Sequence, residues 1–212
     1  MSAYDLEEQE QLAALKAWWK DNSRTVLAVL MLLLAILAAW NGWSWYRRSQ
    51  AVQAAALYDT LQKAARANDL KAARDAAGSI LENFPRTAYA PLAALISAKV
   101  QFQAGELKTA RAQLEWVVEH SRSDEIRSIA RLRLATVLLD DNAPDAALKI
   151  LEAKPQPGFE ALFASLRGDI LVTQKKLAEA RAAYKTAFEK SESGDGALRE
   201  SLRLRLDALG GG

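Results

Sequence analysis

The segment NDLKAAR at residues 68–74 returns three times along the chain, as GELKTAR at 105–111, NAPDAAL at 142–148 and KKLAEAR at 175–181. The copies start 37, 37 and 33 residues apart (68 to 105, 105 to 142 and 142 to 175). Each copy begins with a short polar turn and continues into a helical segment that places alanine on one face. A fixed period of this length is typical of a repeat architecture in which one supersecondary unit stacks on the next.

Apolar residues recur at helical spacing on both sides of every turn, so each unit is predicted to be a helical hairpin. Polar or Pro- and Gly-containing segments at 85, 121–124, 155–158 and 191–196 separate the hairpins. The predicted helix pairs are 49–67 with 70–83, 88–104 with 107–120, 124–140 with 144–153, and 158–174 with 177–190.

A final amphipathic helix is predicted from about residue 197, where it would cap the array. Its apolar stripe consists of Leu198, Leu202, Leu206 and Leu209. The region is rich in Ala, Leu, Arg, Lys and Gln and has no alternating strand pattern, so the fold class is predicted to be all-α.

The units resemble the tetratricopeptide repeat, a helix-turn-helix of about 34 residues with small residues where its two helices meet. Residues at the equivalent positions are small in the first helix (Ala98, Ala135, Gly168), alanine in the second (Ala110, Ala147, Ala180), and then large (Leu114, Leu151, Tyr184). The resemblance implies an α-solenoid of about four hairpins. The alternative is an irregular helical bundle whose period is accidental, because alanine-rich helices resemble one another.

Fifteen consecutive apolar residues at 26–40 precede the repeats, and the wider stretch 25–46 is about as long as a membrane-crossing helix needs to be. Tryptophan and tyrosine favour the membrane interface, and arginine can pair with headgroups. The predicted interface anchors are Trp18, Trp19, Trp43, Trp45, Tyr46, Arg47 and Arg48. The predicted organisation is a head at 1–24 with an amphipathic Trp-Trp segment, a single span at 25–46 and a repeat domain at 49–212.

A cleaved signal peptide is the alternative for this stretch, but it would carry a short basic leader, a shorter apolar run and small residues at the cleavage site. Here 24 residues come first and bulky tryptophans follow. Orientation is less clear, since Lys16, Lys20 and Arg24 precede the apolar stretch and Arg47 and Arg48 follow it. The excess of positive charge favours a cytoplasmic N-terminus only slightly.

No residues that could perform catalysis stand out in the sequence. There is no cysteine and a single histidine, His120, at a predicted helix end, and no phosphate- or dinucleotide-binding glycine motif occurs. Acidic and basic residues are balanced overall, without the basic stripe of a nucleic-acid binder. We therefore expect a protein that is not an enzyme, has no cofactor or metal, and does not bind nucleic acid.

Stacked hairpins present a concave face formed by the first helix of each pair, and such faces bind peptides or partner helices. Lys99 is the only basic residue on this predicted face, so a clamp for a peptide carboxylate is not expected from this set. For the leucines and the phenylalanine an ordinary core position is the alternative. The predicted partner-binding groove consists of Tyr58, Gln62, Leu95, Lys99, Phe102, Leu132, Thr136, Leu139 and Asp169.

The acidic segment 7–10, the Lys16-Ala17-Trp18-Trp19-Lys20 box and the single apolar span that follows resemble the N-terminus of the YfgM family. These proteins are ancillary subunits of the bacterial Sec translocon. One departure is Ser23, where a glycine would be expected after Asn22.

The resemblance implies a single-pass protein of the bacterial inner membrane, with a cytoplasmic N-terminus and a periplasmic repeat domain. The implied partners are Sec translocon subunits, a membrane-anchored periplasmic chaperone of the prolyl-isomerase type, exported polypeptides and the lipid bilayer. The family is also linked to an envelope stress response. A chaperone that holds clients itself, or a generic membrane-tethered scaffold, are alternative functions.

Overall fold

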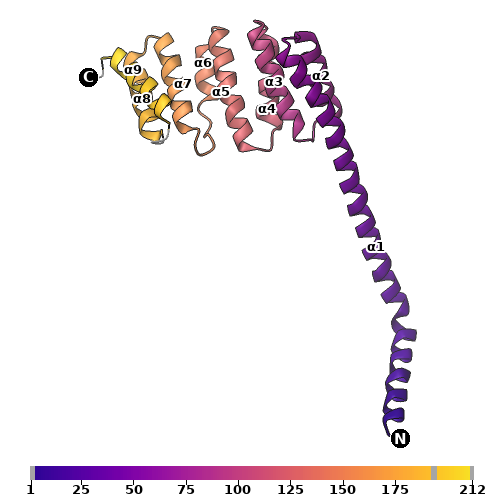
Figure 1. The fold of residues 1–212 in the computed structure, drawn as a ribbon. Coiled ribbons are helices and arrows are strands. Elements are labelled where there is room, and N and C mark those ends of the chain that lie inside the picture. The colour runs from indigo at the N-terminus through magenta and orange to yellow at the C-terminus, as the bar shows by residue number, and fades with distance from the viewer. Residues whose placement is uncertain (1–2, 192–194, 211–212) are drawn as a thin grey trace. The chain divides into compact units, whose positions relative to one another are not determined.

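The computed structural model describes residues 3–191 and 195–210, with side chains from residue 10 onward. Within these ranges the secondary structure is entirely helical, which confirms the all-α prediction. In chain order (Figure 1) the helices are α1 (Ala3–Arg66), α2 (Leu70–Asn83), α3 (Tyr89–Gln103), α4 (Leu107–His120), α5 (Asp124–Asp140), α6 (Pro144–Ile150), α7 (Glu160–Thr173), α8 (Leu177–Lys190) and α9 (Gly196–Ala208).

The chain divides into two compact units, Met1–Gln50 and Ala51–Gly212, and α1 contributes residues to both. In the first unit the apolar side chains of the predicted span are exposed from Leu27 onward, and Val26 is half-buried. Among the described residues, α1 is the one helix that is long and apolar enough to cross a membrane. Of the acidic segment 7–10, the side chains of residues 7–9 lie outside the part of the chain whose side chains are described.

The predicted interface anchors all lie on α1 with exposed side chains. An ideal helix rises about 1.5 Å per residue, so Trp19 and Trp43 would be about 36 Å apart along the axis. The hydrocarbon core of a bilayer is about 30 Å thick. The two aromatic groups therefore have the separation that two interfacial belts need, and their anchoring role remains a prediction.

In the second unit each helix packs against its neighbours in the chain (Figure 1). Contacts join α3 with α4, α5 with α6, and α7 with α8, which form hairpins. Further contacts join α3 with α5 and α5 with α7, so the first helices of successive hairpins lie side by side. Residues of α1, α2 and α3 share one core cluster that includes Leu61, Ala77 and Ala93. The predicted stack of hairpins is therefore present.

All four hairpins turn in the same way, although their turn sequences differ. The first turn residue adopts a left-handed conformation in each case, at Asn68, Gly105, Asn142 and Lys175. The next backbone N–H then donates to a carbonyl five residues earlier, at distances of 2.8–3.0 Å; these bonds are Asp69 to Ala64, Glu106 to Gln101, Ala143 to Leu138 and Lys176 to Leu171. Together with a second bond from the left-handed residue, this is the Schellman motif, which satisfies the last carbonyls of a helix.

The small residues of the repeat lie where paired helices meet. All nine repeat positions proposed from the sequence are buried, from Ala98 in α3 to Tyr184 in α8. Helices α7 and α8 approach each other closely at Gly168, where an added Cβ would lie 2.4 Å from Cε1 of Tyr184. A glycine is therefore required at this position to make room for the ring in the facing helix.

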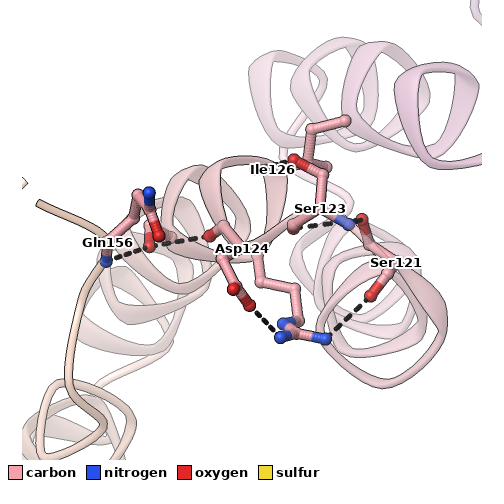
Figure 2. Close-up of polar contacts among 7 residues, drawn as sticks. Ser121, Ser123, Asp124, Ile126 and Gln156 are labelled. Atoms are coloured by element: carbon pink, nitrogen blue, oxygen red, sulfur yellow. Dashed lines mark hydrogen bonds and ion pairs between the residues drawn. The ribbon is translucent and has the colours of Figure 1, made fainter.

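The third hairpin departs from the prediction. The second helix was expected at 144–153, yet α6 ends at Ile150, and α7 begins at Glu160 rather than at 158. After Ile150 the backbone hydrogen bonds include the tighter i to i−3 pattern, from Leu151 to Leu148 at 3.0 Å and from Glu152 to Lys149 at 3.2 Å, so the α-helix ends in a tight turn before the connection that contains Pro155 and Pro157. The α6–α7 connection is instead held against α5, where the Gln156 N–H donates to Ser128 Oγ at 3.0 Å (Figure 2).

The junction between α4 and α5 is closed by side-chain caps (Figure 2). Ser123 accepts a hydrogen bond from the Ile126 N–H at 3.3 Å and so caps α5, and Ser121 Oγ accepts from the Ser123 N–H at 3.3 Å. Arg127 donates to the Ser121 carbonyl at 3.0 Å and pairs with Asp124. A cation near the end of α4 also opposes the negative end of the helix dipole.

The C-terminal helix α9 packs on α8 as the predicted cap. Leu202 is fully buried there, and Leu198, Leu206 and Leu209 pack against the same cluster. In the loop predicted at 191–196, residues 192–194 lie outside the described part of the chain. Arg199 bridges this junction, since it donates to the carbonyls of Phe188 at 3.2 Å and Ser191 at 3.1 Å.

Candidate functional site

The apolar residues of the predicted groove belong mainly to the core. Leu95 is only 6% exposed and is a member of the central cluster. Phe102, Leu132 and Leu139 are partly buried and pack against that cluster. Thr136 donates its hydroxyl to a carbonyl of its own helix at 3.1 Å, that of Leu132. These residues therefore line the first-helix face without forming a free apolar channel.

Two of the polar groove residues lie in one hollow. Gln62 of α1 and Lys99 of α3 line a hollow of about 390 Å³. The other residues around it, which the prediction did not include, are Ala65, Arg66, Asn68, Ile96, Val100 and Gln103. We call these eight residues the basic hollow, because they include two cations and, among the described residues that line it, no carboxylate.

The repeat itself explains why the basic hollow forms. Gln62 and Arg66 are one turn apart on α1, and Lys99 and Gln103 are one turn apart on α3, so each pair shares a helix face. The two pairs are also related by the 37-residue period, 62 with 99 and 66 with 103. The sequence register could have identified Arg66 and Gln103, had the predicted groove extended one turn further along the first helices.

Tyr58, the remaining predicted groove residue of α1, packs against Tyr89 of α3. Their ring centroids are 5.4 Å apart and the rings are tilted by 48°. Such a tilted pair is a favourable aromatic arrangement. Tyr58 is half-buried, so it contributes to the α1–α3 contact and leaves part of its ring at the surface.

Asp169, the predicted groove residue of α7, lies in a polar network that joins three helices. It accepts a hydrogen bond from the Tyr184 hydroxyl of α8 at 2.7 Å and pairs with Arg205 of α9 at 2.9 Å. Arg205 also donates to Ser165 Oγ at 2.8 Å. Burial of the ring, and then the hydrogen bond to Asp169, raise the pKa of Tyr184 above its usual range. Asp169 thus holds α9 in place.

Two exposed apolar side chains on α7 were not part of the predicted groove. Leu162 is 42% exposed and Val172 is 37% exposed. Val172 lies four residues after Gly168, as Phe102 follows Ala98 and Leu139 follows Ala135. The same register that placed Phe102 and Leu139 in the groove could therefore have found Val172. It is more exposed than its equivalents, so the last hairpin carries the more accessible apolar surface.

A second hollow, of about 490 Å³, lies beside the short helix α6. Leu151, Pro155, Phe163 and Leu171 contribute apolar groups to it, and Arg167 contributes a cation. Arg167 donates to the Leu151 carbonyl at 3.2 Å, so part of its charge stabilises the end of α6. The hollow is lined by residues of the α6–α7 connection, of α7 and of α8.

Side chains that could hold a metal or perform acid–base chemistry do not converge in the described part of the chain. No group of three or more His, Asp or Glu residues with a metal-binding arrangement occurs there. His120 is stacked on Trp116, with ring centroids 4.7 Å apart, and its Nδ1 lies 3.0 Å from the Trp116 carbonyl. The histidine thus has a local packing partner at the end of α4.

Comparison with known proteins agrees with this fold. The tetratricopeptide repeat-like domain family matches residues 16–211. A Haemophilus influenzae protein named ancillary SecYEG translocon subunit is 30% identical, over 98% of this chain and 100% of its own length. A Neisseria gonorrhoeae protein of the same name is 31% identical, over 98% and 99%. The chain belongs to this tetratricopeptide repeat-like family of ancillary SecYEG translocon subunits.

Family membership extends across the whole chain. An Escherichia coli member with the same name is 26% identical over 95% of this chain and 96% of its own length. The repeat fold and the resemblance predicted from the Lys-x-Trp-Trp-Lys box are therefore confirmed. The alternative of an irregular bundle with an accidental period is wrong.

Proposed function

We propose that this chain is a membrane-tethered protein-binding module that associates with the SecYEG translocon and is not an enzyme. The observation that carries this proposal is the similarity along the entire length to proteins named for that association. A single candidate span and a stack of helical hairpins fit the role. The span would lie in the bacterial inner membrane, with the N-terminus in the cytoplasm and residues 51–212 in the periplasm.

In the finer version of this proposal, the repeat unit assists a membrane-anchored periplasmic chaperone of the prolyl-isomerase type with newly exported polypeptides. It would also tune an envelope stress response through the same contacts. Tethering supports such a role physically, because confinement near a partner raises the effective concentration, often to the millimolar range for short flexible linkers. Individually weak contacts on the first-helix face would then suffice.

Site-specific crosslinking tests the association. A photoreactive side chain at Val172 or at Lys99, both on first helices and both exposed, should capture translocon subunits or the chaperone in intact cells. The matched control is the same side chain at Lys185, which is exposed on the second helix α8. Capture only from the first-helix positions supports the proposal, whereas equal yields from all three, or none, would contradict it.

A topology reporter tests the orientation separately. A reporter that is active only in the periplasm, fused after Gly212, should be active, and the same reporter fused before Met1 should be silent. The charges that flank residues 25–46 are nearly balanced and do not determine the orientation, so this experiment is needed to decide it. Activity of the N-terminal fusion alone would place the repeat unit in the cytoplasm.

The exposed Leu162 and Val172 favour a second candidate function, in which the repeat unit itself holds unfolded clients. This unit has its own core, so residues 51–212 can be produced without the span. If it holds clients, it should slow aggregation of a reduced model substrate, and replacing Leu162 and Val172 with serine should remove the effect. Substitution of Ala112 with serine, at an exposed position on α4, is the control.

A further inference from the structure

The first turns of α1 carry apolar side chains that no described part of the chain covers. Leu12, Leu15 and Trp19 are 55%, 60% and 49% exposed. They follow one another at intervals of three and four residues, so they share one face of the helix. Lys16 and Lys20, one turn apart, flank this face. We call the three apolar residues the head stripe, and their arrangement beside cations is typical of a helix that lies in a membrane interface.

The other side of the same helix is polar or small. Glu10, Ala17 and Asp21 are seven and four residues apart and share the face opposite the head stripe. The acidic residues Glu7 and Glu8 come before the stripe in the sequence, whereas the two lysines lie within it. The part of the head that can approach a phospholipid surface is therefore the stripe itself, and the acidic segment in front of it is better placed in water.

A straight α1 would leave the head stripe away from the membrane. The predicted span begins at Thr25, and Leu15 and Leu12 precede it by 10 and 13 residues. At a rise of about 1.5 Å per residue, these leucines would lie about 15 and 20 Å beyond the end of the span. The headgroup region is only about 5–8 Å thick on each side of a bilayer. A straight helix would thus carry both leucines through the headgroups and into water.

Residues 21–23, between the head stripe and the span, are the weakest part of the helix there. Asp, Asn and Ser follow one another, and these residues favour helix less than Ala or Leu because their side chains compete for the backbone. Asn22 does so, since its Nδ2 donates to the Trp18 carbonyl at 2.9 Å. The same carbonyl is the acceptor that an α-helix provides for the Asn22 N–H. A side chain that enters the hydrogen-bond ladder is a known cause of helix kinks.

We propose that residues 10–20 lie along the surface of the phospholipid bilayer as an amphipathic helix, and that α1 bends at residues 21–23 where it enters the membrane. The head stripe then reaches about 5–10 Å into the boundary between headgroups and acyl chains. Lys16 and Lys20 lie among the phosphates. The bilayer is the occupant that the chain itself brings to the stripe, because the span begins six residues after Trp19. The inference rests on the membrane span of the proposed function and deepens it, since it assigns the head a lipid surface.

The test uses the full chain in vesicles of phosphatidylcholine and phosphatidylglycerol. The sequence has no cysteine, so one introduced cysteine can carry a nitroxide spin label. Leu15→Cys places the label on the head stripe, and Ala17→Cys places it on the opposite face. Oxygen and a water-soluble nickel chelate are present on both sides of the bilayer. The label at 15 should be severalfold less accessible to the chelate, and more accessible to oxygen, than the label at 17. A straight head would expose both labels to the chelate equally.

Substitutions at the bend locate it. Asn22→Ala together with Ser23→Ala strengthens the helix, because alanine has the highest helix propensity, and should remove much of the difference between the two labels. The matched control is Asn41→Ala with Ser44→Ala, which changes the same residue types at the other end of the span and should leave the difference intact. An unchanged difference in the first variant would contradict a bend at residues 21–23.

Substitutions in the head stripe identify the surface that contacts lipid. Leu12→Ser should bring the label at 15 closer to water, because the stripe loses an apolar side chain. Ala14→Ser, at an exposed position outside the stripe, is the control and should have no effect. Equal effects of the two substitutions would contradict the assignment of the stripe to the bilayer.

Two further results would overturn the proposal. One is equal accessibility of the labels at 15 and 17. The other is a difference that disappears when the vesicles contain less protein, since the head stripe would then pack against a second copy. A label at Leu33→Cys, in the middle of the span, separates this inference from the proposed function. If it is open to the chelate, the span itself fails. If it is protected while the labels at 15 and 17 are equal, only the present inference fails.

Discussion

The second and fourth hairpins, α3–α4 and α7–α8, satisfy the same packing requirement with different side chains. In the second, Ala98 and Leu114 are buried apolar partners at the helix crossing. In the fourth, the equivalent pair is Gly168 and Tyr184, and the ring occupies the space that a Cβ would need. The repeat therefore conserves the summed volume of a pair of positions rather than the residue at either one.

Tyr184 of the fourth hairpin has a consequence that Leu114 of the second lacks. A buried tyrosine hydroxyl needs a hydrogen-bond partner, and Asp169 supplies it. Asp169 in turn pairs with Arg205, which draws α9 onto the last hairpin. A leucine at this position has no hydrogen-bonding group and needs no polar partner. The polar network of the second hairpin involves other residues of α3: Gln101 donates to Ser97 Oγ at 3.2 Å and accepts from Arg74 of α2 at 3.3 Å. In the fourth hairpin the tyrosine ring is therefore linked, through Asp169 and Arg205, to the helix that caps the stack.

The largest expected effect comes from breaking the Gly168–Tyr184 pair. Gly168→Ala should destabilise residues 51–212 by about 2 kcal/mol, because overpacking a filled site costs about 1–3 kcal/mol. Urea unfolding followed by circular dichroism measures the change. The double variant Gly168→Ala with Tyr184→Leu recreates the pair of the second hairpin and should recover at least about 1 kcal/mol of coupling. Additive losses would show that the two positions are independent.

Tyr184→Phe tests the polar network while it keeps the ring. It should destabilise the unit by about 1.5 kcal/mol, since a hydrogen bond to a charged group is lost. The folded-state pKa of Tyr184 is raised, so its contribution is complete below the unfolded value of about 10 and falls as the pH rises towards the folded value. The difference between wild type and variant should therefore shrink above about pH 10. A constant difference would contradict the raised pKa.

The turns of the same two hairpins offer a smaller test. Both begin with a left-handed residue, which is glycine at Gly105 and lysine at Lys175. A side chain in this conformation costs about 1–2 kcal/mol, and glycine gives part of the gain back through its greater freedom when unfolded. Lys175→Gly should therefore stabilise the unit by roughly 0.5–1 kcal/mol. Gly105→Ala is the reciprocal variant and should destabilise it by a similar amount.

The smallest effect is expected at the start of α7, which has an acidic first residue where α3 has none. The backbone N–H of Glu160 itself, and then that of Gly158 at 2.7 Å, lower the pKa of the Glu160 carboxyl. Its stabilising contribution is present above the unfolded pKa and is lost as the pH falls through the lowered one. Glu160→Gln should make the acid limb of the stability profile slightly shallower, and an unchanged limb would contradict the shift.

Much of the fold was predictable because the turn of each hairpin has a recognisable sequence that recurs along the chain. The spacing of the turns and the alanine positions that follow them were visible in the sequence, and all nine small and large repeat positions are buried as the repeat requires. The left-handed conformation of the first turn residue was not predicted. The predicted end of α6 was wrong by three residues, because the sequence pattern does not show where the hydrogen bonds of a short helix change to the tighter pattern found at Leu151 and Glu152.

The candidate site was less predictable. The register placed residues on the first-helix face but could not separate those that fill the core, such as Leu95, from those that remain accessible. It also stopped one turn short of Arg66 and Gln103, and it included Asp169 without the partners on α8 and α9 that occupy it. These partners lie 15 and 36 residues away in the chain, so only the packed structure brings them together.

The shortness of α6 has a mechanical consequence for a protein that is held at one end. A helix of 7 residues is about 10 Å long, whereas those of 14 residues, such as α4 and α8, are about 21 Å long. Fewer interlocked side chains therefore resist separation at the third hairpin. Under tension applied between the span and the C-terminus, the stack should yield first at this point, and the hairpins on either side would extend as two segments rather than one.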